Sequence, residues 1–147
     1  MADFRQNNQR GGYNQFNAAA PRVITAQKIP GNYVDEAEKV INQLPDRPIT
    51  TTKLRKLFGL FTDLYNDVKR QDEDQLTAAQ KQALTTARIR MVYECGREQQ
   101  AVDAFVRAAK LMEYLKGIGD SRSEFMKFHQ YFEALVAYHR FRFGESK

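Results

Sequence analysis

Apolar residues recur every three or four positions from residue 33 onward, which is the spacing of amphipathic helices. The last segment, residues 121–143, begins with Ser121 and Glu124 at the spacing of a capping box, which predicts a helix start. A helix with so wide an apolar stripe must be enclosed by others, so we predict that the domain packs around it. The stripe consists of Phe125, Phe128, Tyr131, Phe132, Leu135, Val136 and His139.

The same spacing predicts four further helices, at about residues 33–44, 53–70, 78–99 and 101–116. Thr77 suits the cap of the third, and Gly96 suggests either a close backbone approach or a kink between the third and fourth. No segment shows sustained strand alternation. The predicted fold class is therefore all-α, a compact bundle of about five helices over residues 33–147.

Residues 1–32 have a different composition, rich in Asn, Gln and Gly with isolated aromatic residues. Such a segment buries too little apolar surface to offset the entropy of ordering, so we predict a disordered tail.

The chain has 147 residues and a net charge of +5. Four cations and one carboxylate fall in residues 1–32, so positive and negative charges are nearly equal in number over the predicted bundle, residues 33–147. Attraction to a polyanion must then come from clustered charge.

Several classes of protein are disfavoured by what the sequence lacks. It has no apolar run of membrane-spanning length, and its N-terminus has no signal-peptide core. The single cysteine, Cys95, excludes an internal disulfide and a zinc site made of cysteines, and its place on an apolar stripe suits a core residue. We therefore expect a cytoplasmic protein with no membrane partner.

Catalytic motifs are also missing. The two histidines, His129 and His139, do not follow a Glu by three residues, and they point about 80° apart on a helix. We place both at the edge of the core. The sequence contains neither a Walker-type phosphate loop nor a His-Glu-x-x-His motif. We expect no metal, no cofactor and no enzymatic activity.

Three groups of basic residues are candidates for binding phosphate. The first, Lys53, Arg55 and Lys56, follows three threonines at a predicted helix start. Cations oppose the helix dipole there, so a phosphate site and an ordinarily capped, solvated helix start both remain open. The second group is Arg88, Arg90 and Arg97, where pairing with Glu94 is the favoured alternative. The third group is Arg122, Lys127 and Arg140. Arg140 shares a polar edge with His129 and Glu133, so Arg122 and Lys127 are the freer candidates. None of these groups has a base-reading geometry, so contacts to the phosphates are expected.

Four segments resemble the small subunit of the type III-A CRISPR effector, the Csm complex. They are residues 33–41, 49–65, 88–97 and 119–141, with the sequences YVDEAEKVI, ITTTKLRKLFGLFTDLY, RIRMVYECGR and GDSRSEFMKFHQYFEALVAYHRF. The resemblance spans nearly all of residues 33–147, and the tail lies outside it. The TTKxRK start and the YFEALVAYH ending are specific in combination.

The resemblance implies a small, all-helical, non-catalytic subunit of an antiviral defence complex. Several copies would line a ribonucleoprotein filament, beside backbone subunits that carry the guide RNA and cleave the target RNA, and with a large subunit that carries other chemistry. The implied partners are guide RNA, target RNA, the backbone and large subunits, and neighbouring copies. Carried over by position, the RNA-binding candidates are Lys53, Arg55, Lys56, Arg88, Arg90, Arg97, Arg122, Lys127 and Arg140. The alternative hypothesis is a helical protein–protein adaptor with no direct contact to nucleic acid.

Overall fold

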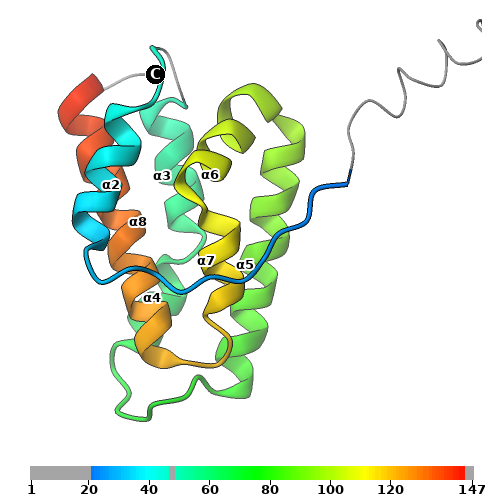
Figure 1. Ribbon diagram of the computed structural model, residues 1–147. Helices are drawn as coiled ribbons and strands as arrows, with labels where there is room; N and C mark the ends of the chain where they lie inside the picture. Colours follow the sequence, from blue (N-terminus) through cyan, green and yellow to red (C-terminus); the bar gives the residue numbers. More distant parts are fainter. Residues whose placement is uncertain (1–20, 47–48, 145–147) are drawn as a thin grey trace, which may run out of the picture.

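The computed structural model describes residues 21–46 and 49–144. Over these residues the chain forms seven α-helices and one π-helix, so the predicted all-α class is confirmed (Figure 1). They are α2 (Tyr33–Asn42), α3 (Thr51–Gly59), α4 (Thr62–Val68), α5 (Ala78–Arg97), η1 (Gln99–Asp103), α6 (Ala104–Ala109), α7 (Leu111–Gly117) and α8 (Arg122–Phe143).

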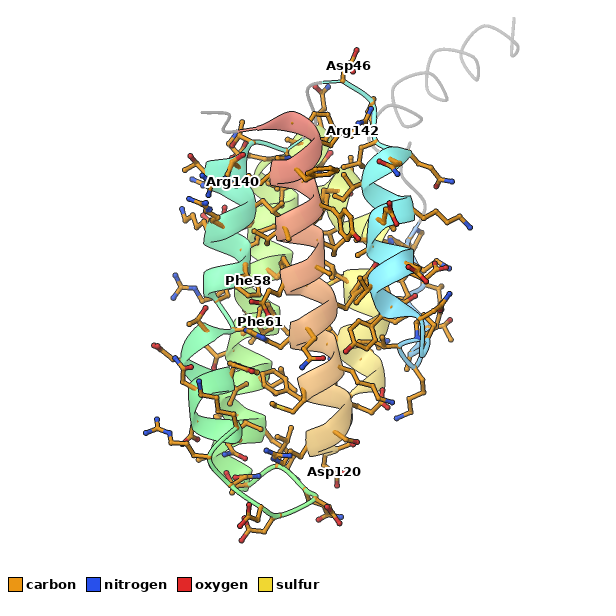
Figure 2. The ribbon with its side chains drawn as sticks, turned by 90° about the vertical axis from the view of Figure 1, so that its left-hand side faces the viewer. Asp46, Phe58, Phe61, Asp120, Arg140 and Arg142 are labelled. Carbon is orange, nitrogen blue, oxygen red and sulfur yellow. The ribbon has the colours of Figure 1, made fainter. Side chains whose placement is uncertain are left out.

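The last helix, α8, is the element around which the bundle packs, as predicted. It contacts α2, α3, α4 and α7, and its buried face is the predicted aromatic stripe, except that Val136 is only half-buried and His129 is buried as well. The Ser121 hydroxyl caps its first turn by accepting the amide hydrogen of Glu124, 3.2 Å away. Phe61, which is fully buried, sets its ring 5.2 Å from that of Phe128 and 6.0 Å from that of Phe132 (Figure 2). Edge-to-face and tilted rings of this kind form the centre of the core.

Two predicted helices are each interrupted, which is why the predicted number of about five is too low. The helix over 53–70 breaks between α3 and α4, where the amides of Leu60 and Phe61 bond to carbonyls three residues back. The helix over 101–116 becomes η1, α6 and α7, and Lys110 adopts a left-handed φ of 57° between α6 and α7. That break frees the Ala109 carbonyl, which accepts the Tyr131 hydroxyl of α8 at 2.8 Å. A tertiary hydrogen bond therefore satisfies the carbonyl that the second interruption exposes.

Of the two alternatives for Gly96, the close approach is wrong, and the break between the two helices lies two residues later, at Glu98. A side chain added at Gly96 would meet nothing within 4 Å, so there is no close approach at this glycine. The helix continues through Gly96 to Arg97 and ends at Glu98, whose φ of −136° and ψ of 78° are not helical. Apolar spacing also places Val34 and Val92 on the apolar stripes of their helices, but the structure leaves them 46% and 50% exposed.

The predicted disordered tail is corrected for residues 21–32, while residues 1–20 lie outside the described part of the chain. We call residues 21–32 the strap, because they run in extended form across α7 (Figure 1). The Gln27 amide donates to the Glu113 carbonyl at 3.0 Å, and Lys28 Nζ donates to the Gly117 carbonyl at 2.8 Å. Ile29 is 5% exposed. Backbone hydrogen bonds and one buried side chain thus order a segment whose composition indicates disorder.

Both histidines are buried, so their predicted place at the edge of the core is wrong. His139 Nε2 bonds to the Ile49 carbonyl at 2.8 Å. His129 stacks on Tyr65 with ring centroids 3.7 Å apart, and neither of its ring nitrogens has a hydrogen-bond partner in the described structure. Burial, aided by the nearby Lys69 ammonium, lowers the pKa of His129 from 6.5 to about 4.

This burial predicts a pH dependence of stability. Below pH 6.5 the unfolded chain binds a proton at His129 that the folded chain excludes until about pH 4. The contribution of neutral His129 is therefore lost as pH falls through this window, by about 2–3 kcal/mol at pH 4.5. Urea unfolding at pH 7 and pH 4.5 measures it, with His129→Phe as the comparison. The variant should lose less stability between the two pH values than the wild type, and equal losses would show that His129 is not responsible.

A candidate nucleic-acid interface

The first candidate group lies at a capped helix start. The Thr50 hydroxyl accepts the Lys53 amide at 3.2 Å, which completes the N-terminal turn of α3. The next threonine, Thr51, is buried, and its hydroxyl donates to the Gly144 carbonyl after α8 at 3.2 Å. These bonds bring the start of α3 and the end of α8 together, and the cations of α3 lie beside both.

A carboxylate from a distant part of the chain organises part of this group. Lys53 Nζ lies 2.5 Å from Glu98 Oε1, although 45 residues separate them in the sequence. The pKa of Glu98 is lowered chiefly by the hydrogen bond from Lys53, and also by the charges of Arg97 and Lys56. Arg97 in turn lies 3.0 Å from Glu94. Lys53 and Lys56 of α3 and Arg97 of α5 therefore gather around Glu98.

Two further arginines extend the cluster toward α8. Arg55 and Arg140 line a groove of about 530 Å³ between α3 and α8, together with Glu133. The walls of the groove include Phe58 and the exposed Phe141. Figure 2 shows Arg140 on the side of α8 that faces α3, whereas Arg142 lies toward α2. Arg142 has a structural role there, because its Nη1 donates to the carbonyls of Ile41 and Leu44 at 2.6 and 2.8 Å.

Arg88 and Arg90 lie on different flanks of α5. Arg90 lines a hollow of about 400 Å³ beside Gly59 and Leu60, at the end of α3. Arg88 instead lines a hollow of about 200 Å³ against α7, with Lys81, Leu115 and Lys116. Arg90 thus joins the side of the bundle that carries the α3 cations, and Arg88 does not.

Six of the nine candidates therefore form one surface, which we call the basic band. It crosses from α8 over α3 to α5, and the carboxylates among its cations are Glu94, Glu98 and Glu133. Six cations against three carboxylates give the band a net charge of +3, whereas residues 33–147 as a whole carry only +2, so positive charge is concentrated on this surface. The band consists of Lys53, Arg55, Lys56, Arg90, Arg97 and Arg140.

Three candidates lie outside the band. One is Arg88, and the other two, Arg122 and Lys127, lie at the opposite end of the bundle and have local partners. Arg122 donates to the backbone carbonyls of Val68 and Lys69 at the end of α4, at 3.2 and 3.4 Å. Lys127 lies 3.4 Å from Glu124, three residues earlier in α8. Their prediction as freer cations is wrong, and the structure does not bring them to the basic band.

Other chemistry finds little support in the described residues. They contain no group of three His, Cys, Asp or Glu side chains that could hold a metal ion. Burial raises the pKa of the Cys95 thiol to about 11, so the thiolate needed for nucleophilic attack is scarce at neutral pH. Among the described helices, none combines the length and apolar character needed to cross a membrane. The surface feature that stands out among the described residues is the clustering of positive charge in the basic band.

Comparison with known proteins gives a consistent result. The family model of Csm2 type III-A matches residues 27–145. A "CRISPR system Cms protein Csm2" of Mycobacterium tuberculosis (strain CDC 1551 / Oshkosh) is 42% identical over 117 residues, which cover 77% of this chain and 93% of the relative. A protein of the same name from Streptococcus thermophilus is 37% identical over 119 residues, covering 78% and 93%. A third, from Enterococcus italicus, is 32% identical over 100 residues, covering 66% and 71%.

Proposed function

This chain belongs to the type III-A Csm2 family, and from that premise we propose that it is the non-catalytic small subunit of a type III-A CRISPR complex. In this role it lines the ribonucleoprotein filament in the cytoplasm, beside the backbone and large subunits and neighbouring copies of itself. It holds the sugar–phosphate backbone of guide and target RNA, and base pairing between the two RNAs supplies the sequence selection.

The observation that carries this proposal is the basic band. Its cations come from three helices that a well-packed core holds in fixed relative positions. Within the described residues, neither Lys56 nor Arg90 forms an ion pair with a carboxylate at contact distance, although Lys56 lies near enough to Glu98 for its charge to act on it. Long, exposed cations suit phosphates, whereas reading bases requires donors and acceptors placed against base edges. Of the candidates, we assign Lys53, Arg55, Lys56, Arg90, Arg97 and Arg140 to RNA.

Binding to RNAs of unrelated sequence tests the proposal. We expect the full chain to bind two labelled RNAs of equal length and different sequence with affinities that agree within about 2-fold, because phosphates are common to both. Its affinity should fall linearly on a plot of log K against log salt, with a slope of about −0.7 for each phosphate contact on a single strand. A strong preference for one sequence would contradict backbone binding. No binding in low salt, alone or in the assembled complex, would favour the protein-only adaptor.

A further inference from the structure

The outer face of α5 carries an apolar surface that the basic band does not explain. Ile89, Val92 and Tyr93 are 63%, 50% and 68% exposed. They account for three of the six large apolar side chains that the described residues expose, and they fall within five positions of one helix. At 100° per residue they form one patch, which we call the α5 patch. Exposed apolar residues gathered in this way mark a contact with another protein.

One flank of the α5 patch carries basic side chains that form no ion pairs with other described residues. Arg88 and Lys81 are seven residues apart on the flank toward α7, and neither has a carboxylate partner within the described residues. Phosphates would satisfy such cations, but they would gain nothing from the exposed aliphatic side chains of Ile89 and Val92. The combination instead favours a protein surface that presents an apolar side chain between carboxylates.

The chain itself presents such a surface on α2. Val34 is 46% exposed, and the exposed side chains of Asp35 and Glu38 lie one residue and one turn further along the helix. Neither carboxylate has a cationic partner within the described residues. The other large apolar side chains exposed outside α5 have basic neighbours, since Val23 follows Arg22 and Phe141 lies between Arg140 and Arg142. Only this α2 surface, among those described, is both apolar and acidic.

We infer that the α5 patch of one copy binds the α2 surface of a second copy. Ile89, Val92 and Tyr93 cover Val34 of the neighbour, while Arg88 and Lys81 face its Asp35 and Glu38. Figure 1 shows α2 and α5 on opposite sides of the bundle, so one copy can use both surfaces at once. Such a heterologous contact leaves a free surface at each end and repeats into an open row. The inference rests on the proposed function, because it names the surfaces that join neighbouring small subunits.

The contact is small, since it joins two single helix faces, and an interface well under about 1,000 Å² is typical of weak association. In a filament the neighbouring subunits hold successive copies at high effective concentration, so a weak contact is sufficient there. The isolated protein should therefore associate only at high protein concentration, and the association should weaken with added salt because charge pairs contribute to it.

Sedimentation velocity of the full chain, free of RNA, tests this inference at protein concentrations from about 10 μM to about 1 mM, the range in which a weak contact becomes populated. The wild type should rise in average mass beyond a dimer. The double variants Ile89→Gln/Tyr93→Gln and Val34→Gln/Glu38→Lys should each stay monomeric. In an equimolar mixture of the two variants, the intact α5 patch of one can bind the intact α2 surface of the other. The mixture should form a dimer and nothing larger, because the two surfaces left over in that dimer are the mutated ones.

The matched control is Gln43→Lys, which adds a cation at the end of α2 on its opposite side and should associate like the wild type. A wild type that stays monomeric at the highest concentration, association that survives in either double variant, or a mixture that stays monomeric would each overturn the inference. Measuring the RNA affinity of the same variants distinguishes failure of this inferred contact from failure of the proposed RNA-binding function. Both double variants leave the basic band intact and should bind RNA with wild-type affinity. If Ile89→Gln/Tyr93→Gln weakens RNA binding without changing sedimentation, the α5 patch binds RNA instead.

Discussion

Replacing Gly117 with alanine should release the strap from α7 and lower the free energy of unfolding by about 2–4 kcal/mol. The reason is a close approach of two backbones. A Cβ atom added at Gly117 would lie 1.9 Å from the Gln27 carbonyl oxygen and 2.7 Å from the Gln27 carbonyl carbon. Since both are backbone atoms, no side-chain rotation relieves the overlap, and the strap must move.

The expected loss follows from what holds the strap in place. Its movement breaks the bonds from the Gln27 amide to Glu113 and from Lys28 to Gly117, each worth about 1 kcal/mol. It also exposes Ile29, whose burial contributes about 1.5–3 kcal/mol. Part of this loss is offset by the chain entropy that the released strap regains.

Gly96→Ala is the matched control, because it makes the same change in a helix with nothing within 4 Å of the added atom. It should leave the strap in place and raise stability by up to about 1 kcal/mol, the helix preference of Ala over Gly. Urea unfolding measures both variants, and trypsin cleavage after Lys28 reports release of the strap. Equal stability and equal resistance to trypsin in the two variants would contradict the role assigned to Gly117.

The strap also shows where sequence reasoning reaches its limit. The aromatic stripe of α8 could be predicted because its period is a local property of the sequence. The position of the strap could not, because it depends on one backbone hydrogen bond to Glu113 and on the missing side chain of Gly117. Neither leaves a pattern within residues 21–32, whose composition resembles that of a disordered segment.

The interrupted helices have a similar explanation. Apolar spacing continues through Leu60 and Phe61 and through Lys110, so periodicity predicts one helix in each place. The break at Lys110 is accompanied by a bond from the Tyr131 hydroxyl to the freed Ala109 carbonyl, 22 residues earlier in the sequence. Contacts between segments far apart in the chain cannot be read from the spacing within either segment.

For the candidate site, the sequence identified the basic residues but not which of them share a surface. Arg90 and Arg97 are seven residues apart on α5, a spacing that puts them on one side of the helix. The sequence did not predict that Glu98 draws Lys53, Lys56 and Arg97 together, since the Lys53–Glu98 pair spans 45 residues. It also treated Arg122 as free, although its guanidinium donates to carbonyls at the end of α4.

Removing three cations from the basic band is the second change with a large expected effect. The triple variant Lys53→Gln/Arg55→Gln/Lys56→Gln should bind RNA about 100-fold more weakly near 0.1 M salt, if each cation neutralises one phosphate. The slope of log K against log salt should become shallower by about 2. These three side chains project from one short helix, and the Thr50 cap and the buried face of α3 remain unchanged. The variant should therefore stay folded.

The most direct test of the account is the affinity of this triple variant for a labelled guide–target RNA duplex, measured beside a control triple variant, Lys69→Gln/Arg70→Gln/Lys127→Gln. The control lowers the net charge by the same amount, but its residues lie on α8 and at the end of α4, away from the basic band. We expect the band variant to lose about 100-fold in affinity and the control to lose a few-fold at most, since distant charges are largely screened. Equal losses in the two variants, or no loss in the band variant, would contradict the assignment of RNA binding to this surface.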